Sequence, residues 1–393
     1  MHVIHIGMGK TGTSSLQSHV FPRLVQRGLI GAYNPRGLCH ALDGAVNGYI
    51  GEESVLPLAR AASARSGRDM LLSNETLIEW DPALWEPAAD RLRRVFGHEA
   101  VIVITLRAPS DYLRSLYQQV IHAGKVRPPE AFFLPRSEYR ALRRFLRPGE
   151  LDAINIDDFD LERMVSHYTA RFASVMIVPF EAIGSLRFLS MLWPAFELER
   201  ASFAAQFAEA PRANTSYSAL AMRLTLARER VLSALGLRSR SASDRQRDKA
   251  LRHLRAETVT PGTAPVPSWH RLMSRVSRHG PKAPYALPQS VSLGVHHTAN
   301  MAFYARICEA AEGQALWLRT GASVAEVTDR TSEARGAGAA PAGSDPALGV
   351  APPATALGAP APEAPAPQAN APQPTPQRCP AARSTSEVRH VCQ

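Results

Sequence analysis

Along the first 210 residues, short apolar runs alternate with stretches whose apolar positions recur every three or four residues. The runs predict buried strands at HVIHI (2–6), DMLLSN (69–74), EAVIVITLR (99–107) and SVMIVPF (174–180). The third run is almost continuous Val and Ile, which is typical of a central parallel strand that is buried on both faces.

The stretches between these runs have helical spacing. Helices are predicted over 16–29, after the loop GMGKTGTSS, over 85–97, which ends on a glycine, and over 161–173. Strands that alternate with helices predict the α/β class, with a central parallel sheet in three layers and helices flanking both faces.

The pattern changes after residue 210. An Arg-rich helix is predicted over 214–236, followed by a polar basic segment, the loop TPGTAPVP at 260–267 and a closing helix within 300–319. From about 333 the chain is rich in Ala, Pro, Gly and Gln, with too few apolar residues to offset the entropy of ordering. The predicted organisation is a domain at 1–325, with a core at 1–210 and an Arg-rich helical part at 211–325, and a disordered tail at 333–393.

Charge and cysteine content narrow the function classes. The formal net charge is +10, which favours anionic partners. Four cysteines without a CxxC pair fit reduced thiols rather than zinc ligation or a disulfide framework. The sequence shows neither a signal peptide nor an apolar run of about 18 residues, so a cytoplasmic protein without a membrane span is expected.

The loop at 7–15 has the composition of an anion-binding turn. Gly7, Gly9 and Gly12 allow a tight approach of the backbone to a phosphate. Nucleotide triphosphatases place a Lys directly after the last Gly of GxxxxGK[ST], but Thr13 stands there and Lys10 lies earlier. The loop therefore suits a single phosphate, bound by N–H groups and by the hydroxyls of Thr11, Thr13, Ser14 and Ser15, although an ordinary strand-to-helix turn has a similar composition.

A second candidate follows the strongest strand. Arg107 stands at its carboxyl end, where ligands bind in open α/β sheets, and Pro109 begins the next helix. Ser115 faces back along that helix, so that an Arg and a hydroxyl could hold a second phosphate. The alternative is a surface Arg at a helix N-terminus.

Together the two stretches resemble the PAPS-dependent sulfotransferases, which use 3′-phosphoadenylyl sulfate (PAPS) as donor. KTGTSSLQ at 10–17 resembles their 5′-phosphosulfate loop, and RAPSDYLRSLY at 107–117 resembles their 3′-phosphate motif RxPxxxxxSxY. LLSNETL at 71–77 and VMIVPFEAI at 175–183 are similar to later strands of the bacterial and carbohydrate-type branch. The resemblance covers about residues 1–235 and implies a P-loop fold.

The resemblance also implies roles for single residues. PAPS would be the co-substrate and no metal is implied. Lys10 would compensate charge at the breaking bond, residues 11–15 would hold the 5′-phosphate, and Arg107 and Ser115 would hold the 3′-phosphate. Glu75 is the candidate base for an acceptor hydroxyl of a glycan or glycolipid. Two alternatives remain: Glu75 lies in the first turn of a helix capped by Ser73 or Asn74, or His122 is the base.

Other functions stay open at this point. A small-molecule kinase using ATP and Mg²⁺ lacks the Lys after Gly12, and a non-catalytic nucleotide- or glycan-binding protein of this fold would bind without turnover. Adenine contacts are unassigned, because the RKGxxGDW motif of some cytosolic sulfotransferases is absent. The Arg-rich span 212–255 could bind an anionic acceptor or an anionic membrane surface, whereas no nucleic-acid recognition motif is present. Three tryptophans are candidates for lining a sugar site or for core packing: Trp80, Trp85 and Trp193.

Overall fold

The computed structural model describes residues 1–46, 50–78, 81–144, 153–210, 217–235, 268–281, 283–321, Val324 and Glu326. The chain divides into two units, Met1–Ala339 and Ala340–Gln393, and every described residue belongs to the first. The predicted tail at 333–393 and the basic segment with its loop up to residue 267 lie outside the described residues. The domain boundaries therefore remain predictions.

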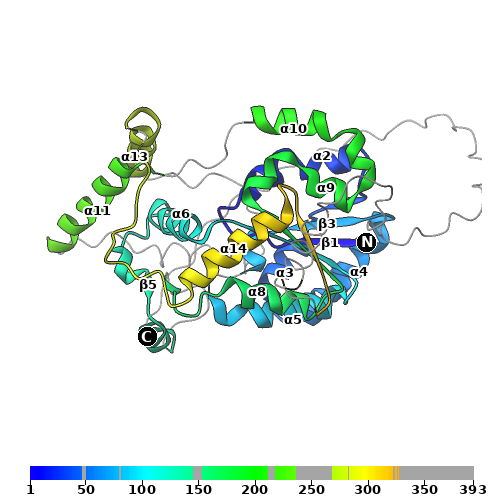
Figure 1. Ribbon diagram of the computed structural model, residues 1–393, viewed down its shortest axis with the longest axis horizontal. Helices are drawn as coiled ribbons and strands as arrows, with labels where there is room; N and C mark the ends of the chain where they lie inside the picture. Colours follow the sequence, from blue (N-terminus) through cyan, green and yellow to red (C-terminus); the bar gives the residue numbers. More distant parts are fainter. Residues whose placement is uncertain are drawn as a thin grey trace, which may run out of the picture. The chain divides into compact units, whose positions relative to one another are not determined.

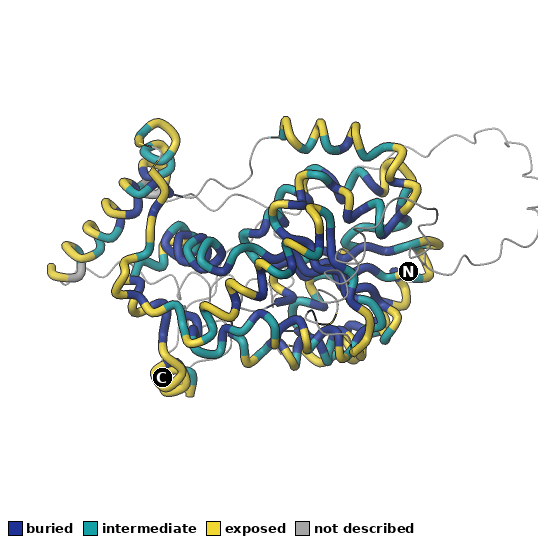
Figure 2. Tube along the Cα trace, viewed as in Figure 1, coloured by how far each residue is buried: buried dark blue, intermediate teal, exposed yellow. Residues whose placement is uncertain are grey.

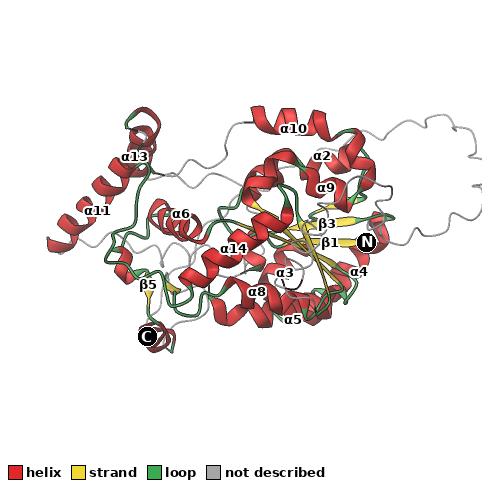
Figure 3. Ribbon diagram, viewed as in Figure 1, coloured by secondary structure: helices red, strands yellow, loops and turns green. Residues whose placement is uncertain are grey.

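A β-sheet lies at the centre of the described unit (Figure 3). It has six strands, in the order β2-β3-β1-β4-β7-β8. Its strands are β1 (His2–His5), β2 (Ala32–Tyr33), β3 (Met70–Ser73), β4 (Val101–Leu106), β7 (Ser174–Pro179) and β8 (Leu316–Arg319). Neighbouring strands run parallel except β7 and β8, which are antiparallel. The predicted α/β class with a central sheet flanked by helices is confirmed, but the sheet is mostly rather than entirely parallel.

Helices cover both faces of this sheet (Figure 1). Successive residues of a strand point to opposite faces, so Val3 and Ile4 enter two different cores. The helices packed in the core of Ile4 include α3 (Leu38–Val46), α4 (Leu56–Ser66), α5 (Trp85–Phe96), α6 (Pro109–His122), α8 (Leu161–Thr169) and α14 (His297–Ala311). Those packed in the core of Val3 are α1 (Thr13–His19), α2 (Phe21–Gln26), α9 (Arg187–Leu192) and α10 (Arg200–Glu209).

Three further helices and a small two-stranded sheet belong to the same unit. They are α7 (Arg136–Arg143), α11 (Ala219–Ala234), α13 (Ser268–His279), and the parallel strands β5 (Phe133–Leu134) and β6 (Ile154–Asn155). Figure 2 shows the central strands buried, whereas the outer turns of the helices are exposed.

Two predicted elements differ from the structure. The helix expected over 16–29 is two helices, α1 and α2, because Pro22 near the start of α2 cannot donate a backbone hydrogen bond to the preceding turn. The closing helix expected within 300–319 ends at Ala311 and is followed by strand β8. Glu312 and Gly313 both have positive φ and end the helix, and burial then alternates along β8, as expected at the edge of a sheet.

The order of the strands determines where ligands can reach the sheet. Strand β1 lies between β3 and β4, and the chain runs from β1 to β3 on one side and from β4 to β7 on the other. Such a switch point leaves the loops after β1 and β4 beside each other at the carboxyl edge, where open α/β sheets bind ligands. These are the loops that carry Lys10 and Arg107.

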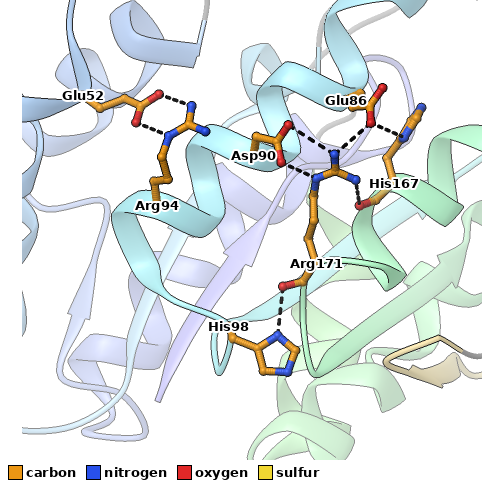
Figure 4. A network of polar contacts seen from close by, with 7 residues as sticks. All are labelled: Glu52, Glu86, Asp90, Arg94, His98, His167 and Arg171. Atoms are coloured by element: carbon orange, nitrogen blue, oxygen red, sulfur yellow. Dashed lines mark hydrogen bonds and ion pairs between the residues drawn. The ribbon is translucent and has the colours of Figure 1, made fainter.

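An ion-pair network connects α5 with α8 and with the loop that follows α8 (Figure 4). Arg171 donates to Asp90 Oδ1 at 2.6 Å and to Glu86 Oε1 at 2.9 Å, and Arg94 is paired with Glu52. We call the residues drawn there the α5–α8 network: Glu52, Glu86, Asp90, Arg94, His98, His167 and Arg171. Its members His98 and Arg171 lie in the loops that enter β4 and β7, so they stand at the opposite ends of those strands from Arg107 and Phe180.

Candidate active site

The loop between β1 and α1 has an unusual backbone. Lys10 adopts a φ of +67° and Gly12 a φ of +80°, which is the left-handed region. A non-glycine residue rarely adopts this conformation unless its surroundings enforce it, and such residues cluster at functional sites. Turns of this kind direct successive backbone N–H groups toward one point and bind anions. The loop thus has the backbone geometry expected for a phosphate site.

Two tight contacts hold the loop against β4. A Cβ on Gly7 would lie 2.1 Å from Thr105 Oγ1 and 2.7 Å from Thr13 Cγ2, so only glycine fits. Thr11 is fully buried, and its Oγ1 donates to the Met8 carbonyl at 2.5 Å and lies 2.7 Å from Thr105 Oγ1. The Thr11 hydroxyl therefore secures the loop instead of facing a phosphate, contrary to the expectation from the sequence.

The remaining hydroxyls of the loop lie at the start of α1. Thr13 is buried, and within the described part of the chain its Oγ1 has no hydrogen-bond partner. Leaving a buried hydroxyl unpaired costs about 1–3 kcal/mol, which a ligand oxygen could recover. Ser14 and Ser15 are half-buried on the same turn. Thr13, Ser14 and Ser15 are therefore the hydroxyls that remain as candidates for phosphate binding.

Arg107 connects the two predicted half-sites. Its Nη1 donates to Ser115 Oγ at 3.1 Å and to the Lys10 carbonyl at 3.2 Å. The guanidinium lies over the ring of Phe180, at 4.7 Å from the centroid, and Phe180 also lies within 3.5 Å of the Cβ position of Gly12. The structure thus brings Lys10, Gly12, Arg107 and Ser115 together, as the two sequence motifs predicted.

The cations of this site lack carboxylate partners. Burial lowers the pKa of Lys10, and the nearby Glu75 carboxylate opposes this shift. Burial also lowers the pKa of Arg107, and Asp111 opposes that shift more weakly. Among the described residues, no carboxylate forms an ion pair or hydrogen bond with either cation. Two half-buried cations without counter-ions favour the binding of an anion.

Glu75 lies next to the loop at the end of β3. It begins the short 3₁₀ helix Glu75–Leu77, whose N-cap is Asn74: the Asn74 side chain accepts from the Thr76 N–H at 3.0 Å. Capping is thus done by Asn74 and leaves the Glu75 carboxylate unused for that purpose. Its Oε2 lies 3.9 Å from the Cβ position of Gly9, and Gln119 Oε1 lies 3.8 Å from the same point.

A buried histidine, His5, lies at the end of β1, shortly before the loop. His5 Nδ1 lies 2.7 Å from Ser73 Oγ, and burial lowers the pKa of His5 to about 3, so the ring is neutral at physiological pH. Ser73 is also held by the side chains of Gln17 and Asn34. This network connects the end of β1 with the end of β3, immediately before Asn74 and Glu75.

Sequence reasoning missed several of these supporting residues. His5 and Thr105 are polar residues inside apolar strands, and that interruption was the available signal. Gln119 on α6 gave no signal, because its proximity to Gly9 depends on tertiary packing. Tyr304 donates a hydrogen bond to Glu181 from α14, about 120 residues later in the chain (|i−j| = 123).

The other sequence candidates lie in packed environments. His122 is seven residues beyond Ser115 on α6, and its ring meets Tyr217 at 4.8 Å, which favours a structural role. Trp85 is buried against Phe159, and Trp193 Nε1 donates to Asp69 at 2.8 Å. These two tryptophans belong to the cores, whereas Trp80 lies outside the described residues.

No group of three or more His, Cys, Asp or Glu side chains within the described residues is placed to hold a metal ion. None of their helices combines the length and the apolar character needed to span a bilayer.

Comparison with known proteins adds little to this geometry. No family model matches the chain. No curated protein matches it either. Among solved structures, it is similar to a sulfotransferase from Alicyclobacillus acidocaldarius, with 18% identity and a TM-score of 0.31 over 62% of this chain and 98% of that chain. A likeness at this TM-score carries no argument about function, which has to be inferred from the residues themselves.

Proposed function

We propose that the protein is a sulfotransferase with a P-loop fold, which moves a sulfuryl group from PAPS to an acceptor hydroxyl of a glycan or glycolipid. One observation carries the proposal: Arg107 donates hydrogen bonds to both Ser115 and the Lys10 carbonyl. Two motifs that are almost 100 residues apart in the sequence (|i−j| = 97) thereby form one cationic site at the carboxyl edge of the sheet.

The site suits a donor that carries two separate phosphate groups. The loop around Lys10 and Gly12 would bind the 5′-phosphate through backbone N–H groups and the hydroxyls of Thr13, Ser14 and Ser15. Arg107 and Ser115 would bind the 3′-phosphate, and the planar guanidinium is suited to paired hydrogen bonds with phosphate oxygens. Lowered pKa values at Lys10 and Arg107 support this assignment, because an anion would neutralise both cations.

The proposed reaction is an in-line displacement at sulfur. The acceptor oxygen forms a bond to sulfur while the bond from sulfur to the bridging oxygen of the 5′-phosphate breaks. The acceptor proton passes to the Glu75 carboxylate, and adenosine 3′,5′-bisphosphate leaves with the electron pair of the broken bond. The Lys10 ammonium stabilises the negative charge that develops on the bridging oxygen.

Glu75 is proposed as the base because it lies beside both the loop and Lys10. Burial lowers the pKa of Lys10, and the Glu75 carboxylate is close enough to the Lys10 ammonium to oppose this shift. Asn74 already caps the turn, so helix capping does not explain why a Glu stands at position 75. A base must reach the acceptor proton, and the carboxyl end of β3 adjoins the loop that would carry the sulfuryl group.

Isothermal titration calorimetry of the full chain tests the donor site. We expect adenosine 3′,5′-bisphosphate to bind more tightly than ATP with Mg²⁺, and Arg107→Ala to weaken bisphosphate binding about 30-fold or more, because a buried charge contact is lost. Arg65→Ala, an exposed arginine on α4, is the matched control and should leave the affinity unchanged. A preference for ATP would support a kinase and overturn the proposal.

Turnover of labelled PAPS with a panel of glycan and glycolipid acceptors tests the chemistry. Glu75→Gln keeps the size of the side chain but removes the base, so transfer should fall about 100-fold or more while bisphosphate affinity stays within threefold. An unaffected Glu75→Gln enzyme would remove this residue from the mechanism. Bisphosphate binding without any turnover would indicate a binding protein of the same fold.

A further inference from the structure

Helices α11 and α13 pack against each other through one side of α11. Ser218 N–H donates to Ser277 Oγ at 3.0 Å, and Trp269 Nε1 donates to Thr225 Oγ1 at 3.3 Å. Met222 is fully buried on the same side of α11. This packing accounts for one face of the helix and leaves the opposite face uncovered by the described residues.

The opposite face of α11 carries an exposed apolar stripe. Leu220 and Leu224 are each 40% exposed, Val231 is 58% exposed, and Leu235, just beyond the helix, is 65% exposed. These residues are spaced four, seven and four positions apart, so they share one face of the helix. In Figure 2 the outer turns of α11 and α13 are exposed.

Arginines border this stripe. Arg223 and Arg230 are exposed, and the spacing of seven places them together along one margin of the stripe. On α13, exposed Arg271 and Arg275 flank Leu272, which is 48% exposed. Within their helical bounds, α11 and α13 together contain one acidic residue, Glu229, and six arginines: Arg223, Arg228, Arg230, Arg271, Arg275 and Arg278.

We propose that the α11–α13 pair binds the surface of an anionic lipid bilayer. Helices with an apolar stripe between basic residues lie in the bilayer interface, with the apolar side chains among the acyl chains and the arginines at the headgroups. Each basic residue near an anionic surface strengthens binding. A bilayer would therefore bind the apolar residues of the stripe and the arginines at the same time. The proposal goes beyond the proposed transfer reaction and does not depend on it.

The arginines of the α11–α13 pair argue against binding partners other than a bilayer at this face. The segment 236–267 between the two helices has seven Arg or Lys against three Asp or Glu, so it would be repelled by the arginines of the pair and would add to the attraction for anionic lipid. A second copy of the chain would place arginines against arginines. A soluble polyanion offers no apolar phase for the four residues of the stripe.

The pair is attached to the helix that carries part of the candidate site. Gln118 Nε2 on α6 donates to the Tyr217 carbonyl at 2.8 Å, two residues before α11 begins. Ser115 lies one turn earlier on the same helix. Binding of the pair to a bilayer would therefore hold α6 near the membrane, where a glycolipid headgroup is available.

Co-sedimentation of the full chain with vesicles tests the proposal. The vesicles contain phosphatidylcholine alone or with about 30% phosphatidylglycerol. We expect binding only to the anionic vesicles, with a strong decrease at high salt. Arg223→Gln/Arg230→Gln should weaken the partition coefficient about tenfold. Leu224→Ser/Val231→Ser should also weaken it about tenfold, because the apolar contribution is lost.

Matched controls separate this surface from general basicity. Arg60→Gln/Arg65→Gln removes two exposed charges from α4 and should leave binding within twofold. Unchanged melting temperatures would show that the variants are folded. Three results would overturn the proposal: no binding by the wild type, equal loss in the α4 control, or self-association that the Leu224→Ser/Val231→Ser variant abolishes. The proposal would also be overturned if soluble heparin bound in competition with vesicles and this binding were unaffected by Leu224→Ser/Val231→Ser.

Discussion

Strand β4 carries a cluster of charged groups at each end. At its carboxyl end lie Arg107 and Lys10, and beyond its amino end lies the α5–α8 network with Arg171 (Figure 4). Hydrogen bonds to Asp90 raise the pKa of Arg171, and the hydrogen bond from Arg171 lowers the pKa of Asp90. At the carboxyl end, burial lowers the pKa of both cations instead.

This difference distinguishes a site that contributes to stability from a site that is prepared for a ligand. In the network each cation has its counter-ion within the protein, so its favourable interactions are already formed on folding. At the carboxyl end the cations are desolvated, and no carboxylate among the described residues forms an ion pair with either of them, so the cost in stability would be offset by a bound anion. Loss of charge should therefore affect function at one end and stability at the other.

The largest expected effect concerns Lys10. Lys10→Met keeps the stem but removes the charge that compensates the leaving oxygen, so the turnover number for sulfuryl transfer should fall about 100- to 1,000-fold. Bisphosphate affinity should fall less than tenfold, because the loop backbone remains. Steady-state kinetics and calorimetry on the same preparation measure both. Equal losses in turnover and affinity would instead assign Lys10 to simple binding.

Replacing each of the two arginines, Arg171 and Arg107, with alanine tests the comparison directly. Arg171→Ala removes the ion-pair partner of Asp90 and one of the contacts of Glu86, and it should lower the melting temperature by about 2–4 °C, corresponding to about 1 kcal/mol for pairs that solvent partly screens. Its bisphosphate affinity should stay within twofold. Arg107→Ala should show the reverse, weak binding with little change in the melting temperature. Thermal denaturation combined with calorimetry decides, and similar behaviour of both variants would refute the distinction.

The titration of Lys10 should make the affinity for the bisphosphate depend on pH. Because burial lowers its pKa, Lys10 loses its proton at a lower pH than an ordinary lysine, and bisphosphate affinity should fall about three- to tenfold as the pH rises through that lowered pKa. Bound bisphosphate adds negative charge and raises the pKa again. Lys10→Met should bind more weakly at neutral pH and lack the alkaline decrease. An alkaline decrease of equal size in that variant would assign it to another group.

The smallest expected effect is at Asp90. Its lowered pKa means that its stabilising contribution is present above the ordinary carboxyl pKa and is lost as pH falls through the lowered value. Asp90 is 40% exposed, so solvent screening limits the effect to about 1–2 °C between wild type and Asp90→Asn at pH 7. Melting curves from pH 7 to pH 3 should converge. The exposed Glu53→Gln control should show no difference at any pH, and a constant Asp90→Asn offset would contradict the titration.

The local sequence pattern predicted the central elements well. Four strands and the helices at 85–97 and 161–173 were confirmed within a few residues, because continuous apolar runs and 3.6-residue periodicity reflect burial directly. The pattern failed at β8, because the apolar residues of this four-residue edge strand follow α14 closely and extended the predicted helix. It also failed to divide α1 from α2, although Pro22 stood in the sequence.

The local sequence pattern predicted only part of the candidate site. Glycine spacing and the strand-to-helix transitions mark where a phosphate can approach, and they indicated Lys10, Thr13, Arg107 and Ser115 as candidates. The burial of the Thr11 hydroxyl against Thr105 was not readable, since it depends on the packing of β4 beside the loop. Gln119 and Tyr304 were also missed for this reason.

By itself, the sequence determined the α/β class, the position of the Gly-rich loop after the first strand and the basic charge of the chain. These features depend on short-range periodicity and composition, which every segment carries within itself. Only the tertiary structure decided that Arg107 reaches both Ser115 and the Lys10 carbonyl, and that the stripe on α11 stays exposed. Such contacts depend on the order of the strands and on which helix faces are covered, and no local pattern encodes either.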